Sequence, residues 1–197
     1  MESLFPFKER VIYSNLRLTP EGLYSVTKRI DGERLIAFLH GMIPGLGKQT
    51  ITDATACVGG DTLLFSLHFK KVESIEWKRH NMVALQNNVD VFGASNVTLH
   101  EGDATRIFDW NTNVLYVDPP WGGPNYYKVY NLELFMGSYR LDNWIEDILK
   151  RDNRPETIVL KLPRNYNFTR LQFLPNVEST HFYRIRNFIV LLLRVSV

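Results

Sequence analysis

The chain has 197 residues, of which 45% are hydrophobic and 22% charged, and its formal net charge is +2. This length suits one well-packed domain, and the charge neither demands nor excludes an anionic partner. The single cysteine, Cys57, excludes an internal disulfide and a cysteine-based zinc site. No apolar run approaches the ~18–20 residues that span a membrane. The first residues lack the basic and apolar regions of a signal peptide, so we expect an intracellular protein.

The first half of the chain alternates predicted helices and strands. Helical spacing of apolar residues predicts a helix over 28–42, which is followed by a strand over 50–54. A turn of small residues, 56–62, then leads into a helix predicted over 63–69. A strand, a glycine turn and a helix start form a common site for nucleotide-like ligands in α/β sheets. The turn lacks the G-x-G-x-x-G spacing, which disfavours an ordinary dinucleotide-binding dehydrogenase.

Acidic residues recur at the ends of three successive predicted strands. Asp53 lies in the strand over 50–54, and Glu76 ends the strand over 72–76. After a helix predicted over 77–92, a third strand over 96–100 leads to Asp103. Each acid alone is also compatible with a solvated loop residue. Their recurrence at one edge of a parallel sheet favours a ligand that brings hydroxyl and amino donors.

The most informative stretch follows a buried strand predicted over 114–117. It reads Asp118-Pro119-Pro120-Trp121-Gly122-Gly123-Pro124. Two consecutive prolines have no backbone N–H, so the strand end offers a carboxylate and bare carbonyl acceptors. This arrangement suits a substrate with donors, such as the exocyclic NH₂ of a base, and Trp121 supplies a flat face for the ring. The alternative is a tight proline turn with a packing tryptophan.

The remainder of the chain completes an α/β fold. An aromatic loop with Tyr126, Tyr127 and Tyr130 precedes a helix over 141–149 and a strand over 157–162. A short helix over 168–174 then leads to two final strands, over 178–186 and 188–195, which meet near Asn187. The order predicts a mostly parallel sheet that a closing antiparallel hairpin completes. The five histidines are scattered without ligand spacing, so no metal is expected.

Four stretches together resemble the trimethylguanosine synthases, which are cap guanine-N2 methyltransferases dependent on S-adenosylmethionine. They are residues 21–27 (EGLYSVT), 53–62 (DATACVGGDT), 118–126 (DPPWGGPNY) and 162–165 (LPRN). Asn87-Asn88, followed by Phe92-Gly93, adds a weaker match. The resemblance implies a Rossmann-like class I methyltransferase fold, with a seven-stranded, mostly parallel sheet and a C-terminal antiparallel hairpin. It implies one domain over 1–197, in which 1–45 form a lid segment and 46–197 the core.

The resemblance also implies roles for individual residues. Those that would hold S-adenosylmethionine are Thr27, Asp53, Ala54, Gly59, Glu76, Asp103, Ala104 and Asp118. Within this set, Thr27 and Asp53 would take the methionine end, Glu76 the ribose, and Asp103 with Ala104 the adenine. Asp118, Pro119 and Trp121 would be catalytic. Those that would contact the acceptor nucleotide are Trp121, Tyr126, Arg164 and Asn165. Trp121 would stack on the 7-methylguanine of a cap, because an indole face attracts a cationic ring.

Two positions depart from the family pattern. Asp118 stands where serine is usual, and an acid there is typical of adenine-N6 methyltransferases acting on RNA or DNA. Cys57 stands where glycine is common. The leading hypothesis is therefore a monomeric enzyme that converts the m⁷G cap of an RNA to a di- or trimethylguanosine cap, in a nucleus or, if viral, in host cytoplasm. Adenine-N6 methylation and a catalytically silent RNA-binding subunit are the alternatives.

Overall fold

The computed structural model describes residues 1–196, apart from the side chain of Gln172. Val197, the last residue of the expected core, lies outside the described residues. The chain divides into two compact units, Met1–Asp103 and Ala104–Val197. The boundary expected between a lid segment and a core at residue 45 stays a prediction. Among residues 1–196, no helix is both long enough and apolar enough to cross a membrane.

The first unit contains three strands, four α-helices and two 3-10 helices (η). In chain order they are η1 (Tyr13–Asn15), α1 (Gly22–Ser25), α2 (Arg29–Met42), η2 (Leu46–Lys48), β1 (Thr50–Asp53), α3 (Gly60–Ser66), β2 (Lys71–Glu76), α4 (Arg79–Phe92) and β3 (Val97–Glu101). β2 pairs in parallel with β1 and with β3. α3 contacts β1 and β2, while α4 contacts β2 and β3. These helices therefore connect neighbouring parallel strands and cover them, as βαβ units do.

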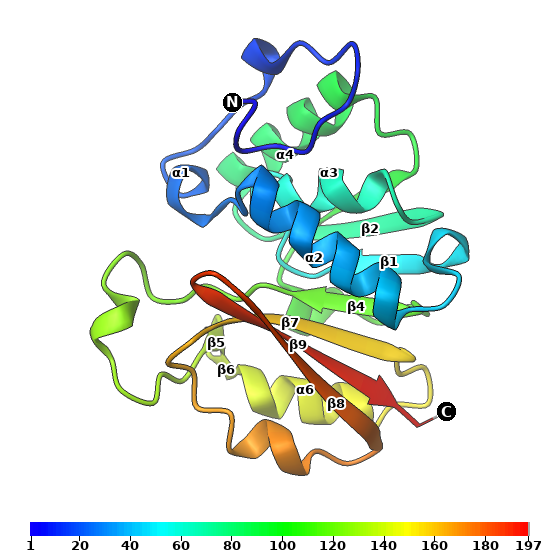
Figure 1. Ribbon diagram of the computed structural model, residues 1–197, viewed down its shortest axis with the longest axis vertical. Helices are drawn as coiled ribbons and strands as arrows, with labels where there is room; N and C mark the ends of the chain where they lie inside the picture. Colours follow the sequence, from blue (N-terminus) through cyan, green and yellow to red (C-terminus); the bar gives the residue numbers. More distant parts are fainter. Residues whose placement is uncertain (197) are drawn as a thin grey trace. The chain divides into compact units, whose positions relative to one another are not determined.

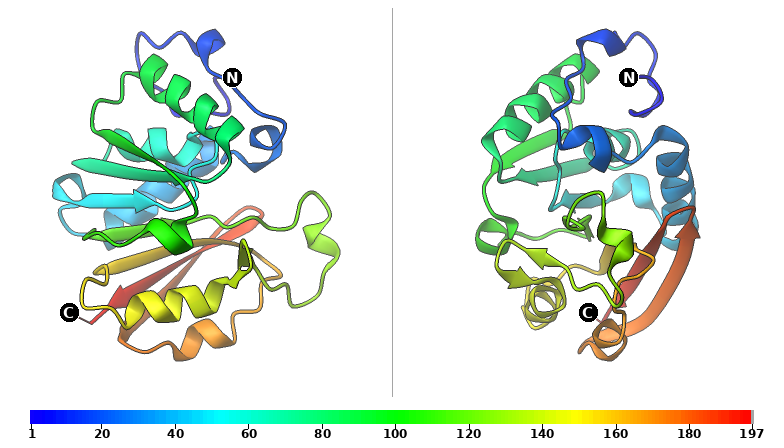
Figure 2. Two further views of the ribbon diagram at one scale, coloured as in Figure 1. Left: turned by 180° about the vertical axis from the view of Figure 1, so that it is seen from behind. Right: turned by 90° about the vertical axis from the view of Figure 1, so that its left-hand side faces the viewer.

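The N-terminal segment is fixed to α4 by side-chain hydrogen bonds. Lys8 Nζ donates to the Phe92 carbonyl at 2.6 Å. Asn88 is fully buried, accepts from the Arg17 N–H at 2.7 Å and donates to the Arg17 carbonyl at 2.9 Å. Both views in Figure 2 show the segment beside this helix. Because the buried amide satisfies both backbone groups of Arg17, it fixes the chain around Arg17 against α4.

The second unit is built around a closing hairpin. Its elements are α5 (Ala104–Ile107), β4 (Val114–Val117), η3 (Tyr126–Lys128), β5 (Phe135–Met136), β6 (Tyr139–Arg140), α6 (Leu141–Leu149), β7 (Thr157–Pro163), η4 (Arg170–Phe173), β8 (Val177–Ile185) and β9 (Phe188–Val195). β4 pairs in parallel with β7, whereas β9 is antiparallel to both β7 and β8. Arg186 adopts a φ of 44° in the turn between β8 and β9. The hairpin therefore needs only two turn residues.

The strand order confirms the predicted fold class. The strands follow the order β3-β2-β1-β4-β7-β9-β8 in a seven-stranded sheet, in which β9 runs antiparallel to β7 and β8. This is the mostly parallel sheet with a C-terminal antiparallel hairpin that the sequence predicts.

Several predicted boundaries are wrong for local physical reasons. The helix expected over 63–69 spans Gly60–Ser66, because Gly59 takes a left-handed φ of 95° and lets the helix begin at once. The helix expected from Trp77 begins at Arg79, since the Glu76 side chain accepts the Lys78 N–H and keeps the turn open. The helix expected over 168–174 is the shorter η4. The β5–β6 hairpin and α1 were not predicted at all.

Candidate active site

The turn after β1 is shaped by two residues in left-handed backbone conformations. Cys57 has a φ of 48° and Gly59 a φ of 95°. The φ of Gly59 strains any L side chain, and a Cβ there would also lie 2.7 Å from Leu85 Cδ1, so glycine is favoured. Burial raises the pKa of the Cys57 thiol to about 11, and its Sγ lies 3.4 Å from Ser25 Oγ. Cys57 is therefore a neutral packing residue whose backbone N–H, rather than its thiol, faces the site.

The Glu76 carboxylate lies at the end of β2 and receives two backbone N–H groups. Cys57 N–H donates to Oε2 at 2.8 Å, and Lys78 N–H donates to Oε1 at 2.7 Å. Only 5% of Glu76 is exposed. Burial raises the pKa of this carboxyl, the two N–H groups lower it, and the nearby Glu21 carboxylate raises it, with a net increase. The Asn81 side chain is a third donor to this carboxyl, which still keeps acceptor capacity because its two oxygens together accept about four hydrogen bonds. A carboxylate that can accept further hydrogen bonds fits a vicinal diol such as a ribose, whose hydroxyls donate them.

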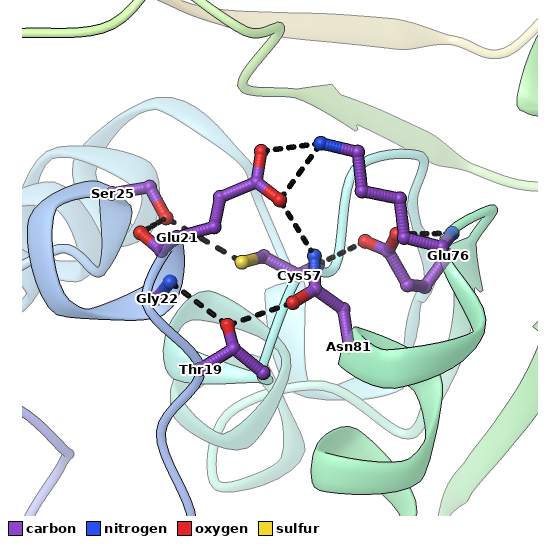
Figure 3. A network of polar contacts seen from close by, with 8 residues as sticks. Thr19, Glu21, Gly22, Ser25, Cys57, Glu76 and Asn81 are labelled. Carbon is purple, nitrogen blue, oxygen red and sulfur yellow. Dashed lines mark hydrogen bonds and ion pairs between the residues drawn. The ribbon is translucent and has the colours of Figure 1, made fainter.

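A second carboxylate, Glu21, lies beside this group and is held by α4 (Figure 3). Lys78 Nζ donates to both Glu21 oxygens at 2.8 Å, and Asn81 Nδ2 donates to Oε2 at 3.1 Å. Asn81 Oδ1 accepts from Thr19 Oγ1 at 2.7 Å, and Thr19 Oγ1 accepts from the Gly22 N–H at 3.0 Å. Although burial opposes it, these bonds lower the pKa of Glu21. The sequence analysis missed this network, although EGLYSVT contains Glu21.

Asp53 and Thr27, the residues expected at the methionine end, both make internal contacts. Asp53 is 1% exposed and accepts from Thr62 Oγ1 at 2.7 Å and from the Thr55 N–H at 3.2 Å. Thr27 Oγ1 donates to Asp61 Oδ2 at 2.9 Å. These contacts fix the start of α3 and the end of the N-terminal segment. Contact of either residue with a cofactor stays a prediction.

The residues expected around an adenine follow β3. The Gly102 N–H donates to the Glu76 carbonyl at 3.0 Å, which ties the end of β3 to the end of β2. Asp103 therefore leaves the sheet beside Glu76, in the first unit. Ala104 is 4% exposed and begins α5 in the second unit. Ala54, the other small residue expected at the cofactor, is 4% exposed directly after β1.

Asp118 follows β4 and forms an ion pair with Lys161 of β7. The Lys161 Nζ lies 2.6 Å from Asp118 Oδ2, and only 4% of the lysine side chain is exposed. The parallel pairing of Val117 with Leu160 brings the next residue of each strand side by side. Lys161 Nζ also lies over the rings of Trp121 and Phe188, 5.6 and 5.1 Å from their centroids. Sequence analysis missed Lys161, although a lysine within an otherwise apolar strand was a visible signal.

Trp121 lies half-buried at the start of the aromatic loop. Its ring makes an edge-to-face contact with Tyr126, with centroids 5.0 Å apart. The Trp121 Nε1 donor is buried and has no hydrogen-bond partner among the described residues. Gly122 and Gly123 have φ values of 88° and 84°, and a Cβ on either would meet no atom within 4 Å. The backbone after Trp121 therefore leaves open space where side chains would otherwise stand.

The end of β7 supports the aromatic loop. Asn165 Nδ2 donates to the carbonyls of Tyr126 and Val129 at 2.9 and 2.7 Å. Arg164, one residue earlier, is exposed, whereas Pro119 at the other strand end is buried. Within the second unit, the predicted residues Trp121, Tyr126 and Asn165 are thus brought together. Among residues 1–196, no group of three or more His, Cys, Asp or Glu side chains is arranged to hold a metal.

The sequence is similar to one protein family over most of its length. The pattern of the RNA cap guanine-N2 methyltransferase family matches residues 48–190. The trimethylguanosine synthase of Saccharomyces cerevisiae is 23% identical over 169 residues, covering 80% of this chain and 51% of that protein. The synthase of Schizosaccharomyces pombe is 27% identical over 149 residues, covering 66% and 60%. The uncharacterized protein L320 of Acanthamoeba polyphaga mimivirus is 34% identical over 125 residues, covering 61% and 48%. The chain thus spans roughly half the length of these curated relatives.

Solved structures with low sequence identity share the fold. The precorrin-6y C5,15-methyltransferase of Geobacter metallireducens has a TM-score of 0.64 at 14% identity, covering 93% of this chain and 95% of that one. An rRNA methylase from Streptococcus thermophilus has a TM-score of 0.55 at 16% identity, covering 82% and 96%. The architecture is therefore that of class I methyltransferases.

Proposed function

The chain belongs to the RNA cap guanine-N2 methyltransferase family, and from this premise we propose that it transfers methyl groups from S-adenosylmethionine to N2 of an m⁷G RNA cap. The products would be di- or trimethylguanosine caps. One observation carries the proposal: the acceptor-only end of β4, Asp118 followed by two prolines, lies next to Trp121 in a loop opened by two glycines. A purine that brings an NH₂ group and a flat ring matches this combination.

The first unit supplies residues that fit the cofactor. Glu76 would accept ribose hydroxyls with the acceptor capacity that its carboxylate keeps beside the Cys57 N–H, the Lys78 N–H and the Asn81 side chain. Asp53 and Thr27 would position the methionine end, and Asp103 would accept from the adenine amino group. When bound, S-adenosylmethionine supplies an electrophilic methyl group on a sulfonium. The protein would contribute mainly position and exclusion of water.

The second unit supplies residues that fit the acceptor amine. An aryl NH₂ is a weak nucleophile because its lone pair is delocalised into the ring. Hydrogen bonds from the NH₂ group to the Asp118 carboxylate and the Pro119 carbonyl would favour a tetrahedral nitrogen with a localised lone pair. The Lys161 ammonium, 2.6 Å from Asp118 Oδ2, would hold the carboxylate in one orientation for this purpose. The excess proton can leave after transfer, so Asp118 need not act as a strong base.

Trp121 would select the cap. A 7-methylguanine ring is cationic and gains cation–π attraction on an indole face, about 0.5–2 kcal/mol over neutral guanine. The buried Trp121 Nε1 donor would also gain from a bound acceptor, since an unsatisfied buried donor is costly. Adenine would stack on the indole without the charge contribution.

Adenine-N6 methylation is the second candidate, and Asp118 is the observation that favours it. An acid at this position accompanies adenine-N6 chemistry, although guanine N2 also offers an NH₂ group to a carboxylate. A methyl-transfer assay across m⁷GpppG, GpppG, uncapped RNA and DNA separates the two. We expect m⁷GpppG to be methylated in clear preference to GpppG. New methyl groups located by mass spectrometry on adenine N6 would favour the alternative and contradict the cap proposal.

A further inference from the structure

The loop that follows β4 presents aromatic rings that the cap site does not use. Among its residues, Tyr127 is 65% exposed and Tyr130 is 90% exposed. Trp121 and Tyr126, in contrast, are half-buried and pack on each other. The Tyr130 ring contributes little to folding, because folding removes almost none of its apolar surface from water. Tyr130 therefore has no evident structural role in the unit that carries it, whereas Tyr127 makes an edge-to-face contact with Tyr126, with centroids 6.2 Å apart.

The backbone under these rings is held in place. Asn165 Nδ2 donates hydrogen bonds to the carbonyls of Tyr126 and Val129. These two bonds hold both ends of the segment that contains Tyr127. The Leu132 N–H donates to the Asn165 carbonyl at 2.8 Å, which closes the far side of the loop next to Tyr130. Leu132 is 9% exposed and forms an isolated parallel bridge with Tyr166. The tyrosines thus stand on an anchored backbone, and a partner that stacks on them need not order the loop.

Between the flanking acids Asp118 and Glu133, the charged side chain of the loop is a cation. Lys128 is exposed, and its Nζ lies 5.8 Å from the centroid of the Tyr127 ring. Arg164 is also exposed and directly precedes the anchoring Asn165. From Pro119 to Leu132 the chain has no acidic residue. Exposed aromatic rings beside lysine and arginine match single-stranded nucleic acid, whose bases stack and whose phosphates pair with cations.

We propose that Tyr127, Lys128 and Tyr130 form a binding platform for the nucleotides that follow the cap, so that the substrate is a capped RNA chain rather than a free cap. This rests on the proposed function. The first transcribed bases would stack on Tyr127 and Tyr130, and Lys128 and Arg164 would contact phosphates. The platform would accept any base, because tyrosine rings offer stacking faces and read no base edge.

The test compares substrates of increasing length in one methyl-transfer assay. kcat/KM is measured for m⁷GTP and for an m⁷GpppApG-capped oligonucleotide with wild-type protein. We expect the capped oligonucleotide to be preferred. In Tyr130→Ala, the ratio of kcat/KM for the oligonucleotide over m⁷GTP should fall about 5- to 150-fold, the range for losing one stacked base. Tyr130→Phe should keep most of the ratio, since the ring remains. Lys128→Gln should reduce the salt dependence of oligonucleotide KM.

Phe173→Ala is the matched control, since Phe173 is an 82% exposed aromatic residue of the same unit and lies outside the loop. It should leave the substrate ratio as in the wild type. A wild-type ratio near one, or a ratio unchanged in Tyr130→Ala while m⁷GTP is methylated, would overturn the platform. Absence of transfer to m⁷GTP and to the capped oligonucleotide alike would overturn the proposed function itself, so the two failures are distinguishable.

Discussion

Replacing Lys78 by methionine tests how the neighbouring charges set the pKa of Glu76 in the proposed cofactor site. Lys78 donates hydrogen bonds to two carboxylates. Its backbone N–H donates to Glu76, and its Nζ donates to both oxygens of Glu21. The substitution keeps the backbone bond and removes only the ammonium. Glu21 would then keep Asn81 as a donor, but its charge would act on Glu76 without compensation. We therefore expect the pKa of Glu76 to rise further in this variant.

The effect on stability follows from the exposure of the ion pair. The side chains of Lys78 and Glu21 are 33% and 25% exposed, between a surface pair and a buried one. Breaking the pair should cost about 1–2 kcal/mol of unfolding free energy, above the surface range and below the buried range. For a chain of this length that corresponds to a decrease in Tm of about 2–8 °C. Thermal unfolding with circular dichroism measures it.

The effect on ligand binding depends on pH, and its sign follows from the raised pKa of Glu76. Folding favours the protonated form of this group, so its contribution to stability is present below the unfolded pKa and is lost as pH rises through the folded pKa. Ribose hydroxyls donate more strongly to the ionised Glu76 carboxylate than to the protonated carboxyl. The affinity for a ligand with a ribose therefore rises as the pH rises through the folded pKa of Glu76. Protonation weakens each hydrogen bond to the carboxyl by about 1 kcal/mol, which is about fivefold in affinity.

Calorimetry with S-adenosylhomocysteine across pH 5 to 8 is the assay. We expect Lys78→Met to bind more weakly than wild type and to regain affinity only at a higher pH. The double variant Glu21→Gln/Lys78→Met should return the midpoint to near the wild-type pH, because the uncompensated charge is gone. Arg79→Met removes the same charge one residue further along, from an exposed pair with Glu101, and should leave the profile unchanged. Identical pH profiles in wild type and Lys78→Met, or no recovery in the double variant, would refute the reasoning.

Substitutions at four further residues test their individual roles in the proposed site. Glu76→Ala should weaken S-adenosylhomocysteine binding by about 1–3 kcal/mol in calorimetry, the range for losing hydrogen bonds to a charged group; an unchanged Kd would remove Glu76 from the cofactor site. Asp118→Ala should abolish most methyl transfer and leave S-adenosylhomocysteine affinity nearly intact, so wild-type turnover would contradict the acceptor role. Trp121→Ala should erase the preference for m⁷GpppG over GpppG in steady-state kinetics, whereas Trp121→Phe should keep part of it. Asn165→Ala should raise KM for a capped oligonucleotide, because the carbonyls of the aromatic loop lose their shared donor; an unchanged KM would show that the anchor is dispensable.

The sequence alone determined the elements with strong apolar patterns. β4 and α6 have the bounds that the sequence predicts, Val114–Val117 and Leu141–Leu149, because a four-residue apolar run and a helical apolar repeat each allow one arrangement. β9 also has its predicted bounds, Phe188–Val195, whereas β8 spans Val177–Ile185 and begins and ends one residue before its prediction. The acids at the strand ends were visible as well, since a parallel sheet gathers its carboxyl ends at one edge.

Backbone conformation gives a reason for the glycine that is common at position 57 in the family. Cys57 stands where glycine is common in the family, and its φ of 48° is in the region that favours glycine. The strained conformation aims its N–H at Glu76. The periodicity of apolar residues in a sequence does not indicate that a single residue has a left-handed backbone conformation.

Only the tertiary structure decided which charges meet. Asp118 contacts Lys161 across 43 residues of sequence, and Glu21 contacts Lys78 and Asn81 across 57 and 60 residues. Such contacts depend on strand register and on how the N-terminal segment lies against α4, neither of which local patterns specify. Residue types and spacing therefore identified the acids at the strand ends but not Glu21. The cations and amides that hold these carboxylates were selected by folding, because a buried carboxylate must find its donors wherever the packed chain brings them.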